Sequence, residues 1–303
     1  MSEVIKREKL DLIHVHYAIP HAICAILAKQ MSGTNIPIVT TLHGTDITVL
    51  GSDASLTESI RFGIEHSDCV TAVSKSLIEQ TYDLIEPNKH IDLVYNFIDE
   101  RIYRPTDSNY LKSKFKIKDN EKVVIHVSNF RPVKRVLDVV KAFNEIQKEI
   151  QAKLLLVGDG PLMAEVTQLV NKLNIRDKVI FLGKQDNVEE LFSISDLMLL
   201  LSEKESFGLV ALEAMACGTP CIGTKIGGIP EIIYDEYNGY LCELGNIEEI
   251  ASKSLHILRD ALLHTKFKEN ALQTALNHFT ADKIVANYEE IYYKLVNVGE
   301  YIE

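Results

Sequence analysis

The sequence alternates between short apolar runs rich in Ile, Val and Leu and longer stretches whose apolar residues recur at helical spacing. Runs at 11–16, 36–42 and 69–74 predict strands, and residues 20–31 and 55–66 between them predict helices. Strands that alternate with helices form parallel sheets, because each helix carries the chain back across one face of the sheet. The first hundred residues therefore predict an α/β domain.

The alternation stops and then resumes in the second part of the chain. Residues 101–120 are polar and charged and contain a proline, which predicts an interdomain connection. Strand patterns return after it, and residues 246–296 read as helix throughout. Strands are expected at 122–128, 153–157, 178–182, 196–201 and 220–223. We therefore expect domains at 1–100 and 121–280, and a helix in 281–303 that packs back on the first domain.

Composition narrows the class of protein. The net charge of −11 over 303 residues argues against a general nucleic-acid binder, which carries a basic surface. The five cysteines are scattered, and Cys217 and Cys221 lack the CxxC spacing of a zinc site, so reduced thiols are expected. The N-terminus is charged, and no apolar run approaches the ~18 residues of a membrane span. We expect a cytoplasmic protein whose partners include neither nucleic acid nor membrane.

The segment "EKESFGLVALEAMACG" holds two glutamates around a predicted strand-to-helix turn. Glu205 lies in the loop, and Glu213 lies about two turns into the helix. We expect the backbone N–H groups near Phe207, Gly208 and Leu209 to lie at a helix N-terminus, and the donors of a helix N-terminus bind anions. Carboxylates beside a phosphate site suit hydroxyl groups, so a nucleotide sugar fits both features. A solvated helix face is the alternative, and a glycosidase pair is disfavoured because eight helical positions span ~12 Å.

A basic cluster follows the first strand of the second predicted domain. Arg131, Lys134 and Arg135 in "SNFRPVKR" lie at the C-terminal edge of the sheet, where open α/β sheets bind ligands. Arginine binds phosphate through its planar fork and lysine as a point charge. In an acidic protein this pattern favours a diphosphate site. A basic helix start that faces solvent is the alternative.

Histidines mark strand ends in the first predicted domain. His43 in "HGTDITVLG" could hydrogen-bond a substrate hydroxyl or a departing oxygen, although a structural loop histidine is equally consistent with the pattern. His14 and His16 share one face of a strand and His21 is close by, but a third ligand with supporting carboxylates is not evident, which disfavours a metal site. "GDGP" at 158–161 lacks the third glycine of a dinucleotide fingerprint, so it is weak evidence for a nicotinamide oxidoreductase.

Taken in order, these segments resemble the retaining glycosyltransferases of family 4, which have the GT-B fold. The resemblance rests on "GDGP", on "FLGKQDNVEELFSISDLMLLLSEKESFGLVALEAMACGTPCIGTKIGGIPEII" and on "NGYLC". It implies two Rossmann-like domains with a cleft between them, and it makes Glu205 and Glu213 the ends of the family's E-x7-E motif. "TTLHGTDITVLGSD" and "VYNFIDERIY" are more similar to members that transfer N-acetylglucosamine from UDP-GlcNAc to L-malate in bacillithiol synthesis.

The resemblance also implies residue roles. Glu213 would hold the uridine ribose and Glu205 the donor sugar, while His43 would contact the sugar near the reacting carbon. Arg131 and Lys134 would neutralise the diphosphate, assisted by the helix start at Ser206, Phe207, Gly208 and Leu209. The acceptor candidates are Tyr17, Thr40, Thr41, Asn96 and Arg101. Family members of this kind need no metal or cofactor, and retention without an evident nucleophile implies front-face substitution by electrostatic support of the leaving group.

The chain departs from the family pattern in two respects. Asn129 stands where many members carry arginine, so Arg131 would substitute from a neighbouring position. The first domain shows about four strands against six in the second, and it opens directly into a strand, without the family's first strand and glycine-rich loop. We therefore expect an incomplete first domain with exposed apolar surface that favours homo-oligomers. The alternatives are a different acceptor and a nucleotide-sugar-binding fragment without activity.

Overall fold

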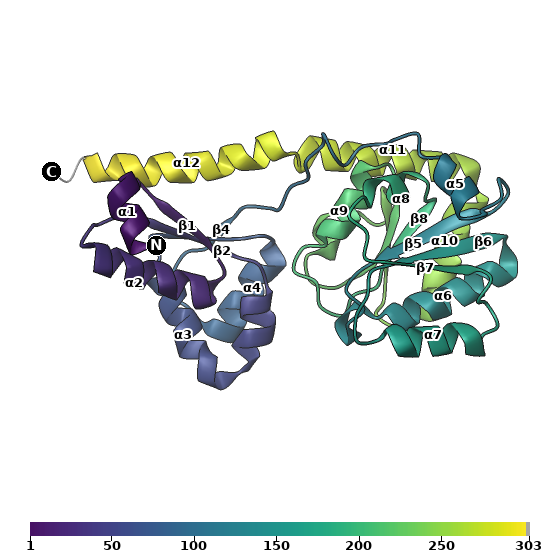
Figure 1. Ribbon diagram of the computed structural model, residues 1–303, viewed down its shortest axis with the longest axis horizontal. Coiled ribbons are helices and arrows are strands. Elements are labelled where there is room, and N and C mark those ends of the chain that lie inside the picture. The colour runs from purple at the N-terminus through teal and green to yellow at the C-terminus, as the bar shows by residue number, and fades with distance from the viewer. Residues whose placement is uncertain (301–303) are drawn as a thin grey trace. The chain divides into compact units, whose positions relative to one another are not determined.

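The computed structural model describes the backbone of residues 1–300 and the side chains of residues 1–296. The chain divides into two compact units, one joining Met1–Asn96 to the chain from Asp282 onward, the other formed by Phe97–Ala281 (Figure 1). Residues 101–120, expected as a connection, lie in the second unit. Their short helix α5 (Tyr110–Lys114) buries Leu111, which fixes the segment to that unit.

The first unit is built on a parallel four-stranded sheet. Its strands follow chain order: β1 (Ile13–His16), β2 (Ile38–Leu42), β3 (Cys69–Ala72) and β4 (Asp92–Leu93). The helices between them are α2 (Ile23–Ser32), α3 (Ala54–Glu65) and α4 (Lys75–Ile85). Ser74 begins α4 by accepting a hydrogen bond from the backbone N–H of Leu77, as expected of an N-cap serine. All five residues of β2 are buried, as is usual for a strand covered on both faces.

Two local expectations for the first unit are wrong. The chain does not open into a strand, because α1 (Ser2–Glu8) precedes β1 and buries Ile5 in a cluster with Ile26 and Ile38. Its two apolar residues, Val4 and Ile5, are adjacent and only Ile5 is buried, which gives too weak a periodic signal to identify this helix from sequence. The helix predicted from residue 20 begins at Ile23, because residues 18–22 form an irregular turn in which Ile19 is not helical.

The second unit contains a parallel six-stranded sheet. Its strands are β5 (Lys122–Val127), β6 (Ala152–Val157), β7 (Val179–Gly183), β8 (Leu197–Leu200), β9 (Cys221–Thr224) and β10 (Gly239–Cys242). They lie in the order β10-β9-β8-β5-β6-β7. The order reverses between β5 and β8, and such reversals open a crevice at the carboxyl ends of the two strands. The sequence pattern indicated about six strands in this unit but did not locate β10.

Helices cover both faces of the six-stranded sheet (Figure 1). One layer packs α6 (Val136–Glu149) against α7 (Met163–Lys172) and α10 (Ile247–Arg259). The other packs α9 (Leu209–Ala216) against α8 (Glu189–Ser193) and α11 (Ala261–His278). Two α/β units with parallel sheets confirm the predicted fold class.

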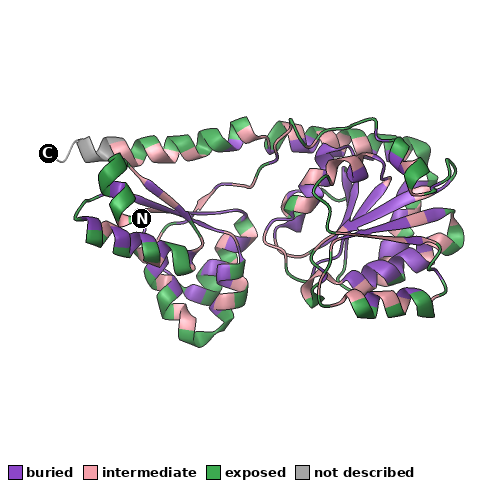
Figure 2. Cartoon of the chain, viewed as in Figure 1, coloured by how far each residue is buried: buried purple, intermediate pink, exposed green. Residues whose placement is uncertain are grey.

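One large part of the second unit's core includes apolar side chains of α6 and of the strands that it covers. Figure 2 shows most strand residues of this unit as buried, while the helices are exposed on their outer sides. In β7 only Val179 is buried. Phe143 on α6 and Leu154 and Leu156 on β6 are buried in one cluster. Burying a large apolar side chain stabilises a fold by about 1.5–3 kcal/mol, so this cluster supports the strand ends on which the site described below depends.

The last helix, α12 (Ala281–Glu300), returns the chain to the first unit. The hydroxyl of Tyr288 lies 3.3 Å from Thr41 Oγ1, and that of Tyr292 lies 2.6 Å from His14 Nδ1. Polar side chains of α12 therefore reach residues of β1 and β2. Among residues 1–300, no helix combines the length and the apolar character needed to cross a membrane.

Candidate functional site

Two loops meet where the strand order of the second unit reverses. Residues 128–135 follow β5 and residues 201–208 follow β8. The backbone N–H of Glu203 donates to the carbonyl of Val133 over 2.8 Å, which ties the loops together. The structure thus brings together the basic cluster and the first glutamate, which are 71 residues apart in sequence.

Lys134 and Glu205 form an ion pair across these loops. The ammonium Nζ lies 2.6 Å from Glu205 Oε2, and both side chains are largely buried. Ser202 Oγ donates to the same oxygen over 3.3 Å. A charge-assisted hydrogen bond of this length fixes both side chains at the strand ends.

The other two basic residues of the cluster, Arg135 and Arg131, differ from Lys134 in their contacts and exposure. Arg135 turns to the helix that follows, where its guanidinium bonds Asp138 Oδ2 at 2.7 Å and approaches Glu203 at 3.4 Å. Arg131 is exposed at the entry to the loop. Of the three predicted cations, Lys134 pairs with Glu205, Arg131 is exposed, and Arg135 pairs with Asp138 near the start of α6.

The "GDGP" turn after β6 has a structural role. Phe130 N–H donates to the Asp159 carbonyl over 2.9 Å, and Leu162 N–H donates to the Phe130 carbonyl over 3.0 Å. A Cβ atom at Gly158 or Gly160 would collide with the backbone at Ser128 or Phe130. Because these glycines carry no side chain, the turn that follows β6 packs closely against the loop that follows β5 and supports its backbone.

Helix α9 begins at Gly208, whose φ of 97° favours glycine. The preceding Phe207 is buried and packs edge-on against Phe279, with ring centroids 5.7 Å apart. Gly228 N–H donates to the Glu205 carbonyl over 3.0 Å, and a Cβ at Gly227 would collide with that same carbonyl. The sequence reasoning did not assign Gly227 and Gly228 to the site, although a double glycine after a strand was the available signal.

Glu213 lies in the second turn of α9 and is mostly buried. Burial raises its pKa to about 7, and a hydrogen bond from Tyr103 opposes part of that rise. Tyr103 comes from the segment that the sequence indicated as a connection. No sequence signal identified it, because 110 positions separate the two residues and their contact depends on how that segment packs.

His126 lies beneath the same loops and is fully buried. Its Nδ1 lies 2.9 Å from the carbonyl of Leu199, and its Nε2 lies 2.8 Å from Ser128 Oγ. Burial lowers its pKa to about 4, so the ring is neutral at pH 7. A carbonyl only accepts, so Nδ1 carries the proton and Nε2 accepts from the Ser128 hydroxyl. This histidine links strands β5 and β8 at the point where the order reverses.

Three histidines of the first unit form a chain at the ends of β1 and β2. His14 and His16 share a face as predicted, with ring centroids 4.6 Å apart, and His16 Nδ1 lies 2.8 Å from His43 Nε2. Burial, with repulsion from neighbouring histidines, lowers the pKa of His14 and of His43 to about 4. His43 is therefore neutral at pH 7. Buried Asp46 fixes its loop by accepting from the N–H groups of Ala18 and Gly44.

The predicted acceptor residues of the first unit have different surroundings. The ring of Tyr17 lies 5.1 Å from that of His43, so these two are neighbours. Thr40 and Thr41 are fully buried, and their hydroxyls bond Ser67 and Thr71 at 2.7 Å, because alternate residues of β2 face opposite helical layers. In this structure neither threonine hydroxyl is free to meet a ligand.

The last two acceptor candidates lie on either side of the point in the chain at which the first unit's N-terminal segment ends. Asn96 is half-buried and ends the N-terminal segment of the first unit. Arg101 belongs to the second unit, where its side chain is 85% exposed and pairs with Asp99 at 2.7 Å. For residues 1–296, no cluster of three His, Cys, Asp or Glu side chains is arranged to hold a metal ion.

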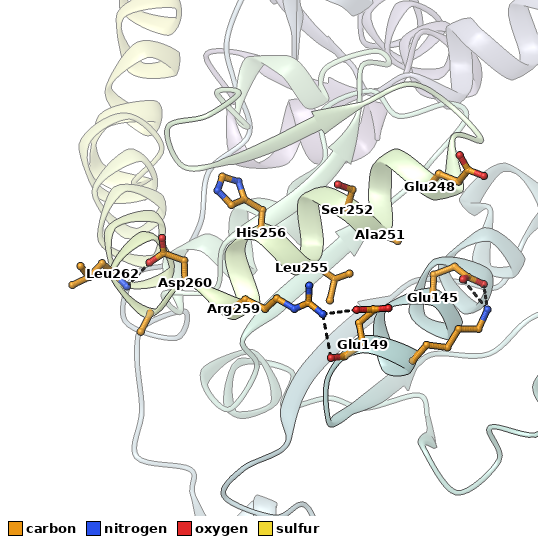
Figure 3. A pocket seen from close by; sticks show the side chains of 12 residues that line it. Glu145, Glu149, Glu248, Ala251, Ser252, Leu255, His256, Arg259, Asp260 and Leu262 are labelled. Carbon is orange, nitrogen blue, oxygen red and sulfur yellow. Dashed lines mark hydrogen bonds and ion pairs between the residues drawn. The ribbon is translucent and has the colours of Figure 1, made fainter.

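A surface groove of about 990 Å³ lies elsewhere on the second unit (Figure 3). It is lined by α6, α10 and the start of α11, and the pair Arg259–Glu149 crosses it at 2.6 Å. None of the predicted site residues lines it. It lies along helices rather than at strand ends, so it adds nothing to the candidate site.

Comparison with known proteins identifies the family. The model for glycosyl transferases group 1 matches residues 107–274, more than half of the chain, and the model for glycosyltransferase family 4 matches residues 1–101. The chain belongs to the family 4 glycosyltransferases. It is therefore a glycosyltransferase of the GT-B fold, as the sequence predicted.

Individual relatives agree with that membership. The N-acetyl-alpha-D-glucosaminyl L-malate synthase of Bacillus anthracis is 61% identical over 296 residues, which cover 98% of this chain and 78% of the relative. A glycosyltransferase from Rickettsia africae superimposes with a TM-score of 0.85 at 23% identity, covering 97% of this chain and 79% of the other. Anabaena HepE in complex with UDP and glucose also gives 0.85 at 23% identity, with coverage of 97% and 81%. These two structures support the fold alone.

Proposed function

We propose that this glycosyltransferase moves N-acetylglucosamine from UDP-GlcNAc to the hydroxyl of L-malate with retention at the anomeric carbon, the first step of bacillithiol synthesis. The observation that carries the proposal is the 61% identity to a relative named for that product, which extends over both units of the chain. Its five cysteines are all free, which fits a reducing compartment, and we propose a cytoplasmic location.

The donor would bind at the strand ends of the second unit. We assign the ribose hydroxyls to Glu213 and the sugar hydroxyls to Glu205, since carboxylates accept such hydrogen bonds. The diphosphate would lie against the N-terminus of α9, where the backbone N–H groups from Ser206 to Leu209 favour an anion. Lys134 would then share its charge between Glu205 and a phosphate oxygen, and Arg131 would add a second cation.

The chemistry follows from this arrangement. The malate hydroxyl oxygen bonds to the anomeric carbon as the bond from that carbon to the β-phosphate oxygen breaks, on the same face of the sugar. The hydroxyl proton passes to the departing phosphate, and UDP leaves. Negative charge develops on the leaving group, so Lys134, Arg131 and the helix N-terminus stabilise the transition state more than the ground state.

Residues of the first unit complete the proposed assignments. His43 is neutral at pH 7, so it would hydrogen-bond a donor-sugar oxygen near the reacting carbon without adding charge. Tyr17 lies beside it and is the acceptor candidate whose phenol can donate to a carboxylate. Asn96 and Arg101 stay candidates for the second carboxylate of malate. Thr40 and Thr41 would need to exchange their present hydrogen bonds to contribute.

The decisive test is UDP release from UDP-GlcNAc by the purified 303-residue chain, with and without L-malate. Malate-dependent release, with an α-linked product by NMR, is the expected result. Release that other hydroxy acids support equally well would contradict the assigned acceptor. Binding of UDP without any transfer would contradict the assigned activity and identify a nucleotide-sugar-binding protein.

A further inference from the structure

A buried carboxylate joins the two loops that carry Tyr17 and His43. The side chain of Asp46 belongs to a residue that is 1% exposed. Its Oδ2 accepts from the backbone N–H of Ala18 over 2.9 Å, and its Oδ1 accepts from that of Gly44 over 3.0 Å. The backbone after β1 and the backbone after β2 are therefore fixed to one side chain. The His43 ring keeps only rotation about its own side-chain bonds, so its contacts with neighbouring rings decide its orientation.

His16 at the end of β1 makes the directed contact with the His43 ring. Its Nδ1 lies 2.8 Å from His43 Nε2, a hydrogen-bond distance, and the two ring centroids are 5.0 Å apart. The ring of Tyr17 lies 5.1 Å from that of His43, but a contact between rings does not distinguish the two nitrogens. Within residues 1–296, His16 is the hydrogen-bond partner of the His43 ring. It engages Nε2 and leaves Nδ1 as the nitrogen that can meet a ligand.

The neighbouring histidines do not compete for this hydrogen bond. His14 lies beside His16, with ring centroids 4.6 Å apart. Its two nitrogens are already engaged, because Nδ1 lies 2.6 Å from the Tyr292 hydroxyl and Nε2 lies 2.7 Å from Thr41 Oγ1. His21 Nδ1 lies 2.5 Å from the backbone carbonyl of His16, so it bonds the strand rather than the ring. Neither neighbour therefore disturbs the pair.

The protonation of the two rings is coupled through the bond. Loss of hydration on burial, and then the charge of His21, lower the pKa of His16. The same loss, and then the charge of His16, lower the pKa of His43 to about 4. Both rings are therefore mainly neutral at pH 7, and a neutral imidazole has one N–H and one acceptor nitrogen. When His16 Nδ1 donates, His43 presents Nδ1–H to a ligand, and when His16 Nδ1 accepts, His43 presents the lone pair of Nδ1.

We propose that His16 is a positioning residue for His43, holding the ring by Nε2 so that Nδ1 is the nitrogen presented to an oxygen of the donor sugar. His16 itself does not touch the sugar and acts through the orientation and the tautomer of its partner. Because the bond can run in either direction, Nδ1 can donate to a sugar oxygen or accept from a sugar hydroxyl. This inference rests on the proposed function, because it takes His43 as the group that meets the sugar near the reacting carbon.

The test compares His16→Phe and His16→Asn with the control His66→Phe. Phenylalanine keeps a ring beside His43 but removes the nitrogen, whereas the asparagine amide places a donor and an acceptor near the position of Nδ1. His66 is an exposed histidine of the same unit, and its Nδ1 donates to the Phe62 carbonyl over 2.9 Å, away from the histidine chain. A neutral hydrogen bond that orients a reacting contact contributes about tenfold in rate.

The expected rates follow from that comparison. In malate-dependent UDP release, kcat should fall about tenfold in His16→Phe, recover to within threefold of wild type in His16→Asn and stay unchanged in His66→Phe. KM for UDP-GlcNAc should change less than threefold in His16→Phe, because the proposed nucleotide contacts lie in the second unit. The double variant of His16→Phe with His43→Ala should be no slower than His43→Ala alone, since His16 acts only through that ring. A merely structural role would lower the rate of the double variant further.

Nitrogen-15 NMR of the imidazole rings measures the pairing without any ligand. The His43 signals are assigned by their absence from His43→Ala, and at pH 8 the shifts of the two ring nitrogens report which of them carries the proton. We expect the Nε2 signal of His43 to move in His16→Phe and to stay in place in His66→Phe.

Unchanged His43 shifts in His16→Phe would overturn the inference, and so would an unchanged kcat or a further loss of kcat in the double variant. If wild type released no UDP while the Nε2 signal still moved in His16→Phe, the proposed function would be wrong and the pairing of the two rings right.

Discussion

The ammonium of Lys134 lies 2.6 Å from a carboxylate oxygen of Glu205, although 71 residues separate the two in the chain. The ion pair joins the loops that follow β5 and β8, where the order of the six-stranded sheet reverses. One group can neutralise phosphate and the other can accept from sugar hydroxyls. Their pairing holds both in place at the carboxyl ends of the strands.

Replacing Lys134 should reduce catalysis strongly. Lys134→Gln removes a cation from the proposed leaving group, and the loss of one such stabilising donor lowers kcat by about 10²–10³. Steady-state UDP release measures the effect. Lys148→Gln on α6, which breaks an exposed pair with Glu145 at 2.7 Å, serves as the control and should be silent. A kcat for Lys134→Gln within threefold of wild type would exclude Lys134 from the leaving-group site.

Gly227 should be intolerant of a side chain. Its φ is +56°, and an added Cβ would collide with the Glu205 carbonyl, so Gly227→Ala must displace the loop that carries Glu205. Gly33 has a φ of +68° and open space around it, so Gly33→Ala carries the backbone strain without the collision. We expect Gly227→Ala to weaken UDP binding more than tenfold and Gly33→Ala to leave it intact. Equal UDP affinities in the two variants would contradict the close packing of these loops.

The ionisation of Glu213 should make stability depend on pH. Its pKa rises from 4.5 to about 7 on folding, mainly because it is buried. The folded state therefore holds a proton that the unfolded state releases, and stability present below pH 4.5 is lost as pH rises through 7. Glu213→Gln removes this dependence, so between pH 5 and pH 8 it should gain up to about 3 kcal/mol relative to wild type. Urea unfolding at both pH values measures the difference, which a pH-independent offset would contradict.

The histidine chain of the first unit should make stability depend on pH in the opposite direction, so that stability is lost as pH falls. The pKa values of His14 and His43 fall from 6.5 to about 4 on folding, so their contribution is present above pH 6.5 and is lost as pH falls toward 4. The stability deficit of His14→Gln should therefore shrink as pH falls over that range. His66 is exposed and lies outside the histidine chain, so its replacement provides the control for losing a histidine elsewhere in the first unit. Chemical denaturation of each variant at several pH values tests this.

The repeating elements could be predicted because their signal is local. The strand expected at 122–128 is found at Lys122–Val127, and the helix expected at 55–66 is found at Ala54–Glu65. Apolar periodicity depends only on the order of residues along the chain, and both elements bury apolar residues at positions that this pattern predicts. Helix α1 escaped prediction because only Ile5 faces the core.

The candidate site was predicted in part. The sequence analysis recognised the motif that contains Glu205 and Glu213 and the basic cluster that contains Lys134, because their charged side chains follow predicted strands. Thr40 and Thr41 were expected to face a ligand, but tertiary packing buries both hydroxyls against other side chains. Tyr103 was missed, because an isolated tyrosine in a polar stretch carries no signal of its partner.

The sequence by itself determined that this chain forms two α/β units and belongs to a glycosyltransferase family, since both follow from local periodicity and from motifs of contiguous residues. Only the tertiary structure decided that Lys134 pairs with Glu205 and that the hydroxyls of Thr40 and Thr41 bond other side chains. Those contacts join residues that are far apart along the chain, 71 positions for Lys134 and Glu205, and strand order and packing set their distances. Burial then sets the pKa values of Glu213 and His43, because the cost of removing a charge from water depends on what surrounds the group after folding.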